Sequence, residues 1–411
     1  MLEGELAREI GRGTQALACF ERACAFAQDD KEKCAAWIGI AMVHRLTSDV
    51  QAGFAALAAA ETLAAAHDET RELAHIHYLR GGLLFTAGDV DACRGEHELA
   101  LKFAQQSGDL EREAQAQSGL ADAFYAQGRM RSARAAFSRC VEICERGGFA
   151  RFAIMNRCML AVIEHYFGES TAAIASLEET RATAHKVKHL AAEAMAEECI
   201  GWILTNCGRY AEARGPLDHG LALSRDIGMR RFETVCMICL AHVLCAEGSK
   251  DEARQLAHAA WKLCQQFSPR FAGPSALGTI ARLARSEDER SEALAAAESL
   301  LAQGCVGHSA LQFYVSAIDM ALEHRQWAEA ERYANALEDY AKEEPLPWTD
   351  FFTARGRALA AAGRGFADRD ALESLRRAAL RFGYAAAVPA LEAALMACHS
   401  TATAGPSLRS G

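Results

Sequence analysis

The sequence predicts an all-α fold, namely an α-solenoid of about nine to ten helix pairs with a repeat of about 40 residues. Helix-forming residues dominate the 411-residue chain, which has only 7 prolines and no alternating runs of β-branched residues. Glycines recur at a spacing of 40, at positions 88, 128, 168, 208 and 248. Because one helix pair cannot bury its own apolar faces, this repetition indicates pairs that stack on their neighbours.

The recurring glycine marks the turn inside each helix pair. Each of the five glycines follows an apolar helical stretch, and glycine readily adopts the left-handed conformation that ends a helix. We call this glycine the anchor, the helix before it helix A and the helix after it helix B. Weaker anchors extend the series in both directions and fall at Gly11, Ser48, Asp288, Arg325 and Gly363.

Small residues lie at fixed positions of both helices. Seven residues before the anchor, helix A carries for example Ala121 and Gly201. Five residues after it, helix B carries Ala133 and Ala213, and a large residue such as Leu217 follows four positions later. Only small residues fit where two helix backbones approach to about 8 Å. We therefore expect helices A and B of each unit to pack closely.

This spacing resembles a known repeat family. Two runs are similar to tetratricopeptide repeats, namely Leu120-Ala121, Phe124, Gly128, Ala133 and Phe137, and Ile200-Gly201, Leu204, Gly208, Ala213 and Leu217. The period of 40 exceeds the roughly 34 residues usual in that family. The resemblance implies a right-handed solenoid whose A helices line a concave surface that binds a protein or a peptide.

The longer repeat also resembles a narrower group. Residues 88–148 are similar to the C-terminal repeats of bacterial signalling proteins that join a class III nucleotide cyclase to an AAA-type ATPase. This resemblance implies a scaffold or regulatory module with a cyclase or an ATPase as its partner. The sequence has no Gly-x-x-x-x-Gly-Lys-Ser/Thr phosphate loop and no paired aspartates of a cyclase. We therefore expect no enzymatic activity and no cofactor.

Composition narrows the class of partner and the compartment. Lys and Arg number 44 and Asp and Glu number 54, and the net charge of −10 argues against nucleic acid and anionic membranes as partners. No apolar run approaches the ~20 residues of a spanning helix, and the N-terminus lacks an apolar signal core. The 15 cysteines lie mostly among apolar residues, which is typical of reduced thiols. We expect a cytoplasmic protein; its oligomeric state stays open.

Two patterns have the spacing of metal ligands. Cys236 and Cys239 form a Cys-x-x-Cys pair, but no second pair lies nearby, so we interpret them as two core thiols. His185 and His189 lie one helical turn apart, and the lysines between them favour a solvated basic face. The sequence therefore predicts no metal site.

Proline positions suggest the internal boundaries. We expect an N-terminal array over residues 1–266 and, after Pro269 and Pro274, a looser segment of the same solenoid over 267–398. Residues 399–411 have the composition of a disordered tail. Only ten residues precede Gly11, so Met1 is expected to open a fragment or a shortened relative, unless residues 2–10 form a capping helix.

The candidate binding residues follow from the tetratricopeptide resemblance, which implies contact positions 13, 10, 6, 3 and 2 residues before each anchor. Applied along the chain, this pattern selects His75, Tyr78, Phe85, Asp122, Tyr125, His165, Tyr166, Glu198, Trp202, Asn206, His242, Arg282 and Arg285. Aromatic and arginine side chains suit an interaction groove, although several could instead pack against the next helix.

The leading hypothesis is a protein or peptide held in the concave groove. The alternative is a sensor that encloses a small ligand or a signalling peptide in a deep inner pocket. Two further hypotheses are an enzyme, which would need titratable groups in an enclosed site, and a purely self-associating array.

Overall fold

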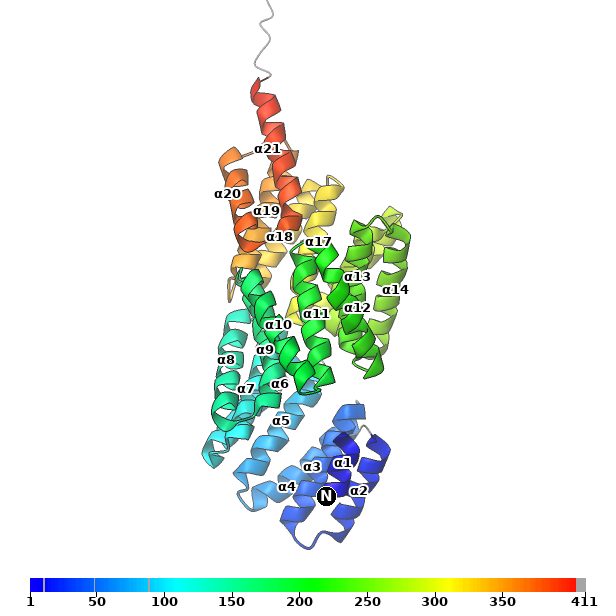
Figure 1. The fold of residues 1–411 in the computed structure, drawn as a ribbon, viewed down its shortest axis with the longest axis vertical. Coiled ribbons are helices and arrows are strands. Elements are labelled where there is room, and N and C mark those ends of the chain that lie inside the picture. Colours follow the sequence, from blue (N-terminus) through cyan, green and yellow to red (C-terminus); the bar gives the residue numbers. More distant parts are fainter. Residues whose placement is uncertain (10–11, 48, 88, 404–411) are drawn as a thin grey trace, which may run out of the picture. The chain divides into compact units, whose positions relative to one another are not determined.

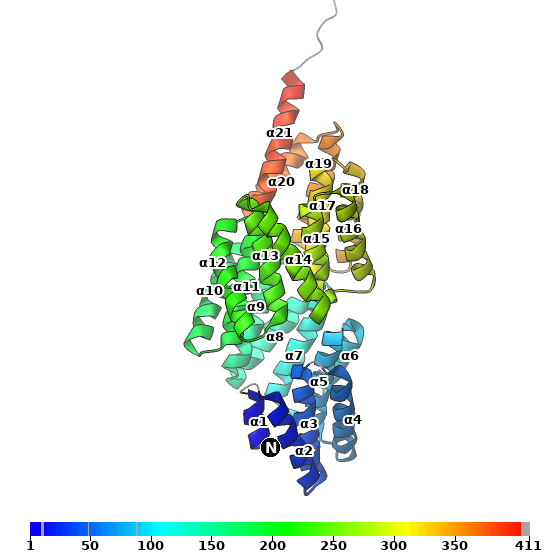
Figure 2. The same cartoon turned by 90° about the vertical axis from the view of Figure 1, so that its right-hand side faces the viewer.

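The computed structural model describes residues 1–9, 12–47, 49–87 and 89–403. This part of the chain forms 21 α-helices and one short 3-10 helix and contains no strand (Figure 1 and Figure 2). The all-α prediction is therefore confirmed. The predicted anchors Gly11, Ser48 and Gly88 lie outside the described residues, as do residues 404–411 of the predicted tail. Within the described ranges, no helix is both long enough and apolar enough to span a membrane.

The helices form two compact units, which we describe separately. Unit 1 comprises Met1–Gln127 and Ser132–Asn156, and unit 2 comprises Gly128–Arg131 and the chain from Arg157 onward. The helices up to the division are α1 Leu2–Glu9, α2 Gly13–Phe26, α3 Asp30–Thr47, α4 Val50–Ala66, α5 Thr70–Ala87, α6 Val90–Ser107, α7 Leu110–Ala126, α8 Met130–Gly147 and α9 Ala150–Tyr166, of which α8 and α9 contribute to both units.

The remaining helices belong to unit 2. They are α10 Ser170–Lys186, α11 Leu190–Asn206, α12 Tyr210–Asp226, α13 Arg230–Ala246, α14 Lys250–Phe267, α15 Pro269–Leu283, α16 Glu287–Ala302, α17 Gly307–Glu323, α18 Trp327–Ala341, α19 Pro347–Gly363, α20 Arg369–Phe382 and α21 Val388–Thr403. The 3-10 helix Ala385–Ala387 precedes α21, and α21 ends inside the segment predicted as a tail.

The helix bounds reproduce the predicted repeat. Helices α7, α9, α11 and α13 begin at residues 110, 150, 190 and 230. Their anchors Gly128, Gly168, Gly208 and Gly248 all have left-handed φ angles between 75° and 91°. Odd-numbered helices are thus the predicted A helices. Consecutive A helices contact each other in unit 1 from α1 to α7 and in unit 2 from α11 to α19.

Two of the weaker anchors were placed wrongly. Asp288 lies inside α16, because the turn occupies residues 284–286 just before that helix. Gly363 is the last residue of α19, and Gly365 takes the left-handed conformation two residues later, with a φ of 88°. Arg325 does lie at a turn and adopts a φ of 58° without being glycine.

The small residues permit the close helix packing that the sequence predicts. A Cβ added to Gly201 would lie 2.4 Å from the side chain of Leu217, the large residue expected on helix B. In unit 1, the buried ring of His97 fills the space above two glycines of neighbouring A helices. An added Cβ would lie 2.5 Å from this ring at Gly81 and 2.2 Å from it at Gly119.

We expect Gly119→Ala to lower the free energy of unfolding by about 1–3 kcal/mol, because the new methyl group overlaps the His97 ring. Gly95→Ala in α6 is the matched control. No atom lies within 4 Å of its added Cβ, so this variant should gain about 0.5–1 kcal/mol from lower backbone entropy in the unfolded chain. Urea unfolding measures both, and equal effects would contradict the tight packing.

The helical array continues through the proline-rich stretch after residue 266. Pro269 is the first residue of α15, where its missing N–H removes no helical hydrogen bond, and Pro274 lies inside the same helix. Helix α15 contacts α13, α14, α16 and α17. The compact units divide near residue 156, whereas the predicted break at 267 falls within unit 2.

Candidate functional site

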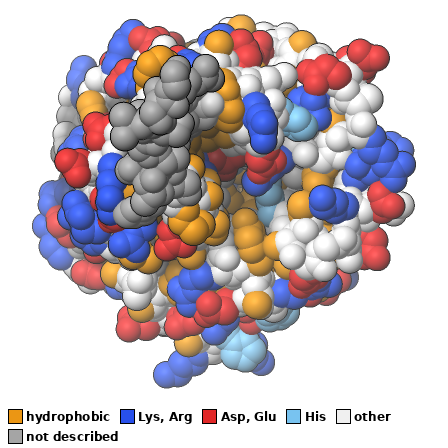
Figure 3. Space-filling model, turned by 90° about the horizontal axis from the view of Figure 1, so that it is seen from above, with side chains coloured by type: hydrophobic (Ala, Val, Ile, Leu, Met, Phe, Trp, Pro, Cys, Tyr) orange, Lys and Arg blue, Asp and Glu red, His pale blue; other side chains and the backbone are white. Residues whose placement is uncertain are grey.

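Unit 2 contains a cavity of about 1040 Å³. Its walls come from the A helices α11, α13, α15, α17 and α19 and from the C-terminal helix α21. Apolar side chains dominate the walls, among them Trp202, Val235, Ile238, Phe352 and Leu359. Figure 3 shows a hollow with hydrophobic side chains inside it and charged side chains nearby.

The C-terminal segment closes the cavity on one side. Ala386 N donates a 3.3 Å hydrogen bond to Cys207 O, and Ser170 Oγ donates a 3.2 Å hydrogen bond to Phe382 O. These contacts fix the segment before α21 to the turn after α11 and the start of α10. Helix α21 then contributes a wall of small side chains, namely Ala390, Ala393, Ala394 and Ala397.

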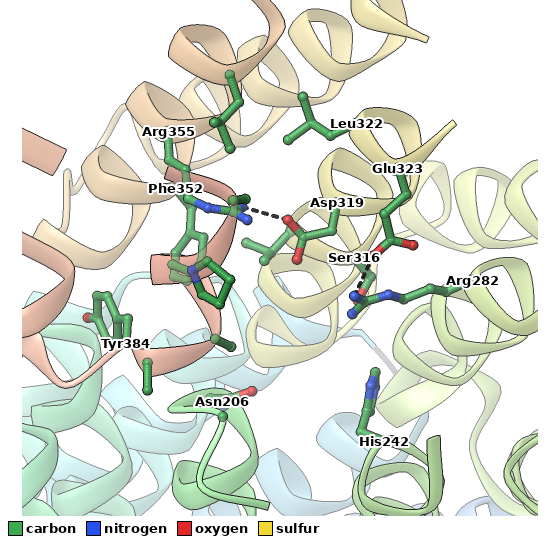
Figure 4. A pocket seen from close by; sticks show the side chains of 18 of the residues that line it. Asn206, His242, Arg282, Ser316, Asp319, Leu322, Glu323, Phe352, Arg355 and Tyr384 are labelled. Carbon is green, nitrogen blue, oxygen red and sulfur yellow. Dashed lines mark hydrogen bonds and ion pairs between the residues drawn. The ribbon is translucent and has the colours of Figure 1, made fainter. Parts of the chain in front are cut away.

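Two ion pairs lie in the cavity wall (Figure 4). Arg282 Nη2 is 2.6 Å from Glu323 Oε1, and Arg355 Nη1 is 2.5 Å from Asp319 Oδ1. Burial disfavours the charge on Arg282, but Asp319 and Glu323 outweigh this effect and raise its pKa. The wall therefore presents two cations and two anions side by side.

His242 is neutral at physiological pH. Burial is the main cause that lowers its pKa to about 4, and the charge of Arg282 adds to it. The Thr279 hydroxyl donates to Ser275 O at 3.0 Å, so its oxygen can accept from His242 Nε2, which is 3.1 Å away. The imidazole thus contributes polarity to the cavity without a charge.

Four buried donors in the cavity wall have no hydrogen-bond partner among the described residues. They are Asn206 Nδ2, Gln312 Nε2, Arg355 Nε and the Tyr384 hydroxyl. A buried donor without a partner costs about 1–3 kcal/mol, so such groups in a native cavity are the places where a ligand can form hydrogen bonds. They require acceptor atoms on the ligand.

The structure places the predicted binding residues in several different environments. Trp202, Asn206, His242 and Arg282 line the cavity of unit 2. Arg285 is exposed beyond the end of α15 and forms an ion pair with Asp251. The predicted residues of unit 1 are the half-buried His75, Tyr78, Phe85 and Asp122 and the buried Tyr125.

His165 and Tyr166 were expected on an open inner surface, but both are fully buried. Tyr384 of the C-terminal segment and Trp348 of α19 cover them, with ring centres 5.9 Å apart for Tyr384 and His165 and 5.4 Å apart for Trp348 and Tyr166. Burial lowers the pKa of His165 to about 3, so this histidine is neutral. The two residues therefore hold the C-terminal segment in place.

Cavity residues of α17 and α19 were not among the predicted binding residues, although the same spacing contains them. Counting 13, 6 and 2 residues back from Arg325 gives Gln312, Asp319 and Glu323. Counting 13 and 10 back from the corrected anchor Gly365 gives Phe352 and Arg355. A uniform application of the rule would have found the three residues of α17, whereas the two of α19 also require the corrected anchor. No spacing signal marks Tyr384, which lies after the last helix pair.

Glu198 is buried in a cluster of thiols rather than in the cavity wall. Its carboxylate accepts a 3.4 Å hydrogen bond from Cys199 Sγ, and burial raises its pKa to about 7. Cys236 and Cys239 are buried, as predicted for core thiols. Among the residues that the structure describes, no cluster of His, Cys, Asp and Glu is arranged to hold a metal ion.

We expect the stability to depend on pH through Glu198. The pKa rises from 4.5 in the unfolded chain to about 7 in the fold, so raising the pH through this range costs the folded state about 3 kcal/mol. Glu198→Gln should therefore be about 3 kcal/mol more stable than the wild type above pH 7, and the gain should vanish below pH 4.5. Urea unfolding at pH 5 and 8 measures this difference. A gain that does not change with pH would contradict the buried carboxyl.

Comparisons with known proteins support the repeat architecture. Residues 72–146 match the model of the tetratricopeptide repeat family. A Rap protein complexed with Competence and Sporulation Factor has a similar structure, with a TM-score of 0.64 and 13% identity, over 83% of this chain and 94% of that chain. The apo form of RapI has a TM-score of 0.52 and 12% identity, over 64% of this chain and 97% of that chain.

No curated protein matches this sequence. At identities of 12% and 13%, the Rap structures show a shared fold. The matched segment, the helix pairs and the left-handed anchors agree with one another: the chain is an all-α helical repeat protein, and its residues 72–146 match the tetratricopeptide repeat.

Proposed function

We propose that the chain is a receptor for a short peptide, which binds in the cavity of unit 2. The observation that carries this proposal is the set of four unsatisfied donors among apolar walls. A peptide offers a carbonyl acceptor at every residue and apolar side chains between them, so it can satisfy both kinds of surface at once.

The size of the cavity supports a peptide over a small metabolite. Pockets for small molecules measure about 300–1,000 Å³, and this cavity of about 1040 Å³ lies at the upper limit. The wall carries the ion pairs Arg282–Glu323 and Arg355–Asp319, which offer partners for both charged ends of a peptide. One of the similar structures is a complex with Competence and Sporulation Factor, which fits a signal-binding function for this fold.

This proposal favours the enclosed pocket over the open groove for a protein domain. The fold is typical of binding scaffolds rather than enzymes, and the neutral His242 and paired charges of the cavity suit recognition. A role in bacterial signalling, with a nucleotide cyclase or an AAA-type ATPase as the regulated partner, is the further part of this proposal. It rests on the resemblance of residues 88–148.

Affinity selection tests the proposal. The immobilised full chain is incubated with a library of random peptides of about five to ten residues, and bound peptides are identified by mass spectrometry. We expect Ala394→Trp to reduce the enrichment, because the indole would project from α21 into the cavity and obstruct part of it. Ala295→Trp on the exposed face of α16 is the matched control and should select the same peptides as the wild type. Equal enrichment by the Ala394→Trp variant would contradict the proposal.

A further inference from the structure

The A helices of unit 1 bring four arginines together. Helices α1, α3, α5 and α7 lie next to one another, since each contacts the following A helix. Arg8, Arg45, Arg71 and Arg112 come from these four helices, one from each. We call this group the arginine cluster of unit 1. None of the hypotheses for unit 2 uses it.

Contacts connect members of the cluster to the neighbouring A helices. Arg45 reaches from α3 to α5, where its guanidinium carbon lies 5.8 Å from the centre of the Tyr78 ring. Arg71 Nε is 2.5 Å from Asp109 Oδ2. Arg112 Nη1 donates a 2.8 Å hydrogen bond to Gln115 Oε1. The cationic groups therefore extend across three consecutive A helices, α3, α5 and α7.

The positive charge of the cluster is only partly compensated. Within the described ranges, Arg8, Arg45 and Arg112 form no ion pair, and Arg8 Nε and Arg112 Nε are buried without a hydrogen-bond partner. The nearby acids are Glu72, Asp109 and Glu111, as their effects on the pKa of Arg112 show. Only Asp109 among these acids pairs with a member of the cluster at salt-bridge distance.

All four arginines of the cluster affect the pKa of His75. Burial is the largest cause that lowers its pKa well below the usual value, followed by the charges of Arg112, Arg45, Arg71 and Arg8. The histidine stays neutral mainly because burial disfavours its charge, and the four arginines add to this effect. The same field attracts an anion.

We propose that the arginine cluster of unit 1 binds an acidic segment of a partner protein through the side-chain carboxylates of that segment. Guanidinium groups bind carboxylates with two parallel hydrogen bonds, and the free N–H groups of Arg8 and Arg112 lack such acceptors in the chain itself. The half-buried ring of Tyr78 supplies an apolar contact beside Arg45. The net charge of −10 repels every long polyanion, including nucleic acid, that extends beyond the cluster, whereas a short acidic segment can be confined to it.

Fluorescence anisotropy with the full chain tests the inference. The probe is a labelled peptide of twelve glutamates with acetylated and amidated ends, so that no terminal carboxylate contributes. A peptide of twelve glutamines is the neutral control. We expect the acidic peptide to bind, with an affinity that falls as salt is raised from 50 to 300 mM, and the neutral peptide to show no binding.

Charge-neutralising variants locate the site. Arg45→Gln and Arg112→Gln should each weaken binding about ten-fold, because each removes a charge-assisted contact. Arg45→Lys should retain part of the affinity. Arg22→Gln is the control, since Arg22 is exposed on α2 outside the cluster. Circular dichroism and thermal melting confirm folding for each variant, and a fall in affinity counts only for a folded chain.

Three outcomes would overturn the inference: equal binding of the glutamine peptide, an equal loss in the Arg22→Gln variant, or tighter binding of a single-stranded oligonucleotide than of the acidic peptide. The inference is separate from peptide reception in unit 2. Accordingly, Ala394→Trp should bind the glutamate peptide as the wild type does.

Discussion

Replacing Arg355 with alanine is expected to lower the free energy of unfolding by about 3–5 kcal/mol. The Arg355 side chain is only 6% exposed, and its Nη1 is paired with Asp319 at 2.5 Å. Removal of one member of a buried ion pair leaves the other charged and without its counter-ion, which costs far more than the pair itself contributes. Urea unfolding at pH 7 measures the loss, and peptide binding should fall in parallel because Arg355 lines the cavity.

Two comparisons make this prediction specific. Arg357 lies two residues along α19 and pairs with Glu338 on the surface, so Arg357→Ala should cost no more than about 1 kcal/mol. The double variant Arg355→Met with Asp319→Leu should recover most of the stability, because no isolated charge remains. A loss below about 1 kcal/mol for Arg355→Ala would show that Asp319 is solvated.

Replacing Gly208 with alanine is expected to detach the C-terminal segment from the turn after α11. Gly208 has a φ of 76°, which costs an alanine about 1 kcal/mol, and an added Cβ would lie 2.7 Å from Ala386 N. Because backbone cannot rotate away as a flexible side chain can, the clash should bring the total loss to about 2–4 kcal/mol. Hydrogen exchange of residues 382–398 should increase, and peptide affinity should fall as the cavity opens.

The Gly248→Ala variant separates the backbone strain from the clash with Ala386. Gly248 occupies the same turn one repeat later, with a φ of 91°, but no atom lies within 4 Å of its added Cβ. This variant should lose only about 1 kcal/mol through backbone strain and leave the exchange of α21 unchanged. If both variants behave alike, the C-terminal segment is not held against Gly208.

The period of the sequence predicts the fold because each turn depends on local chemistry. A left-handed glycine such as Gly208 and a small residue such as Gly201 impose their conformation and their helix spacing wherever they occur. Four cavity residues, including Trp202 and Asn206, follow from the same repeat, and Gln312, Asp319 and Glu323 of α17 follow once the rule is extended to Arg325.

The closure of the cavity could not be predicted in this way. Phe382 and Ser170 are separated by 212 residues, and Ala386 packs against a turn of a much earlier repeat. Such contacts depend on how all the A helices of unit 2 together bring the first and last helices of the unit into contact. The sequence of a single repeat does not determine this arrangement. For this reason His165 and Tyr166, which the spacing places on the inner face, are buried beneath Tyr384 and Trp348.

A crystal structure of the full chain with a selected peptide would show directly whether the partly enclosed cavity of unit 2 is a peptide site. The account predicts electron density for the peptide inside the cavity, with its carbonyl oxygens within hydrogen-bond distance of Asn206 Nδ2 and Gln312 Nε2. A peptide bound on the outer B helices, with the cavity still holding only solvent, would contradict it.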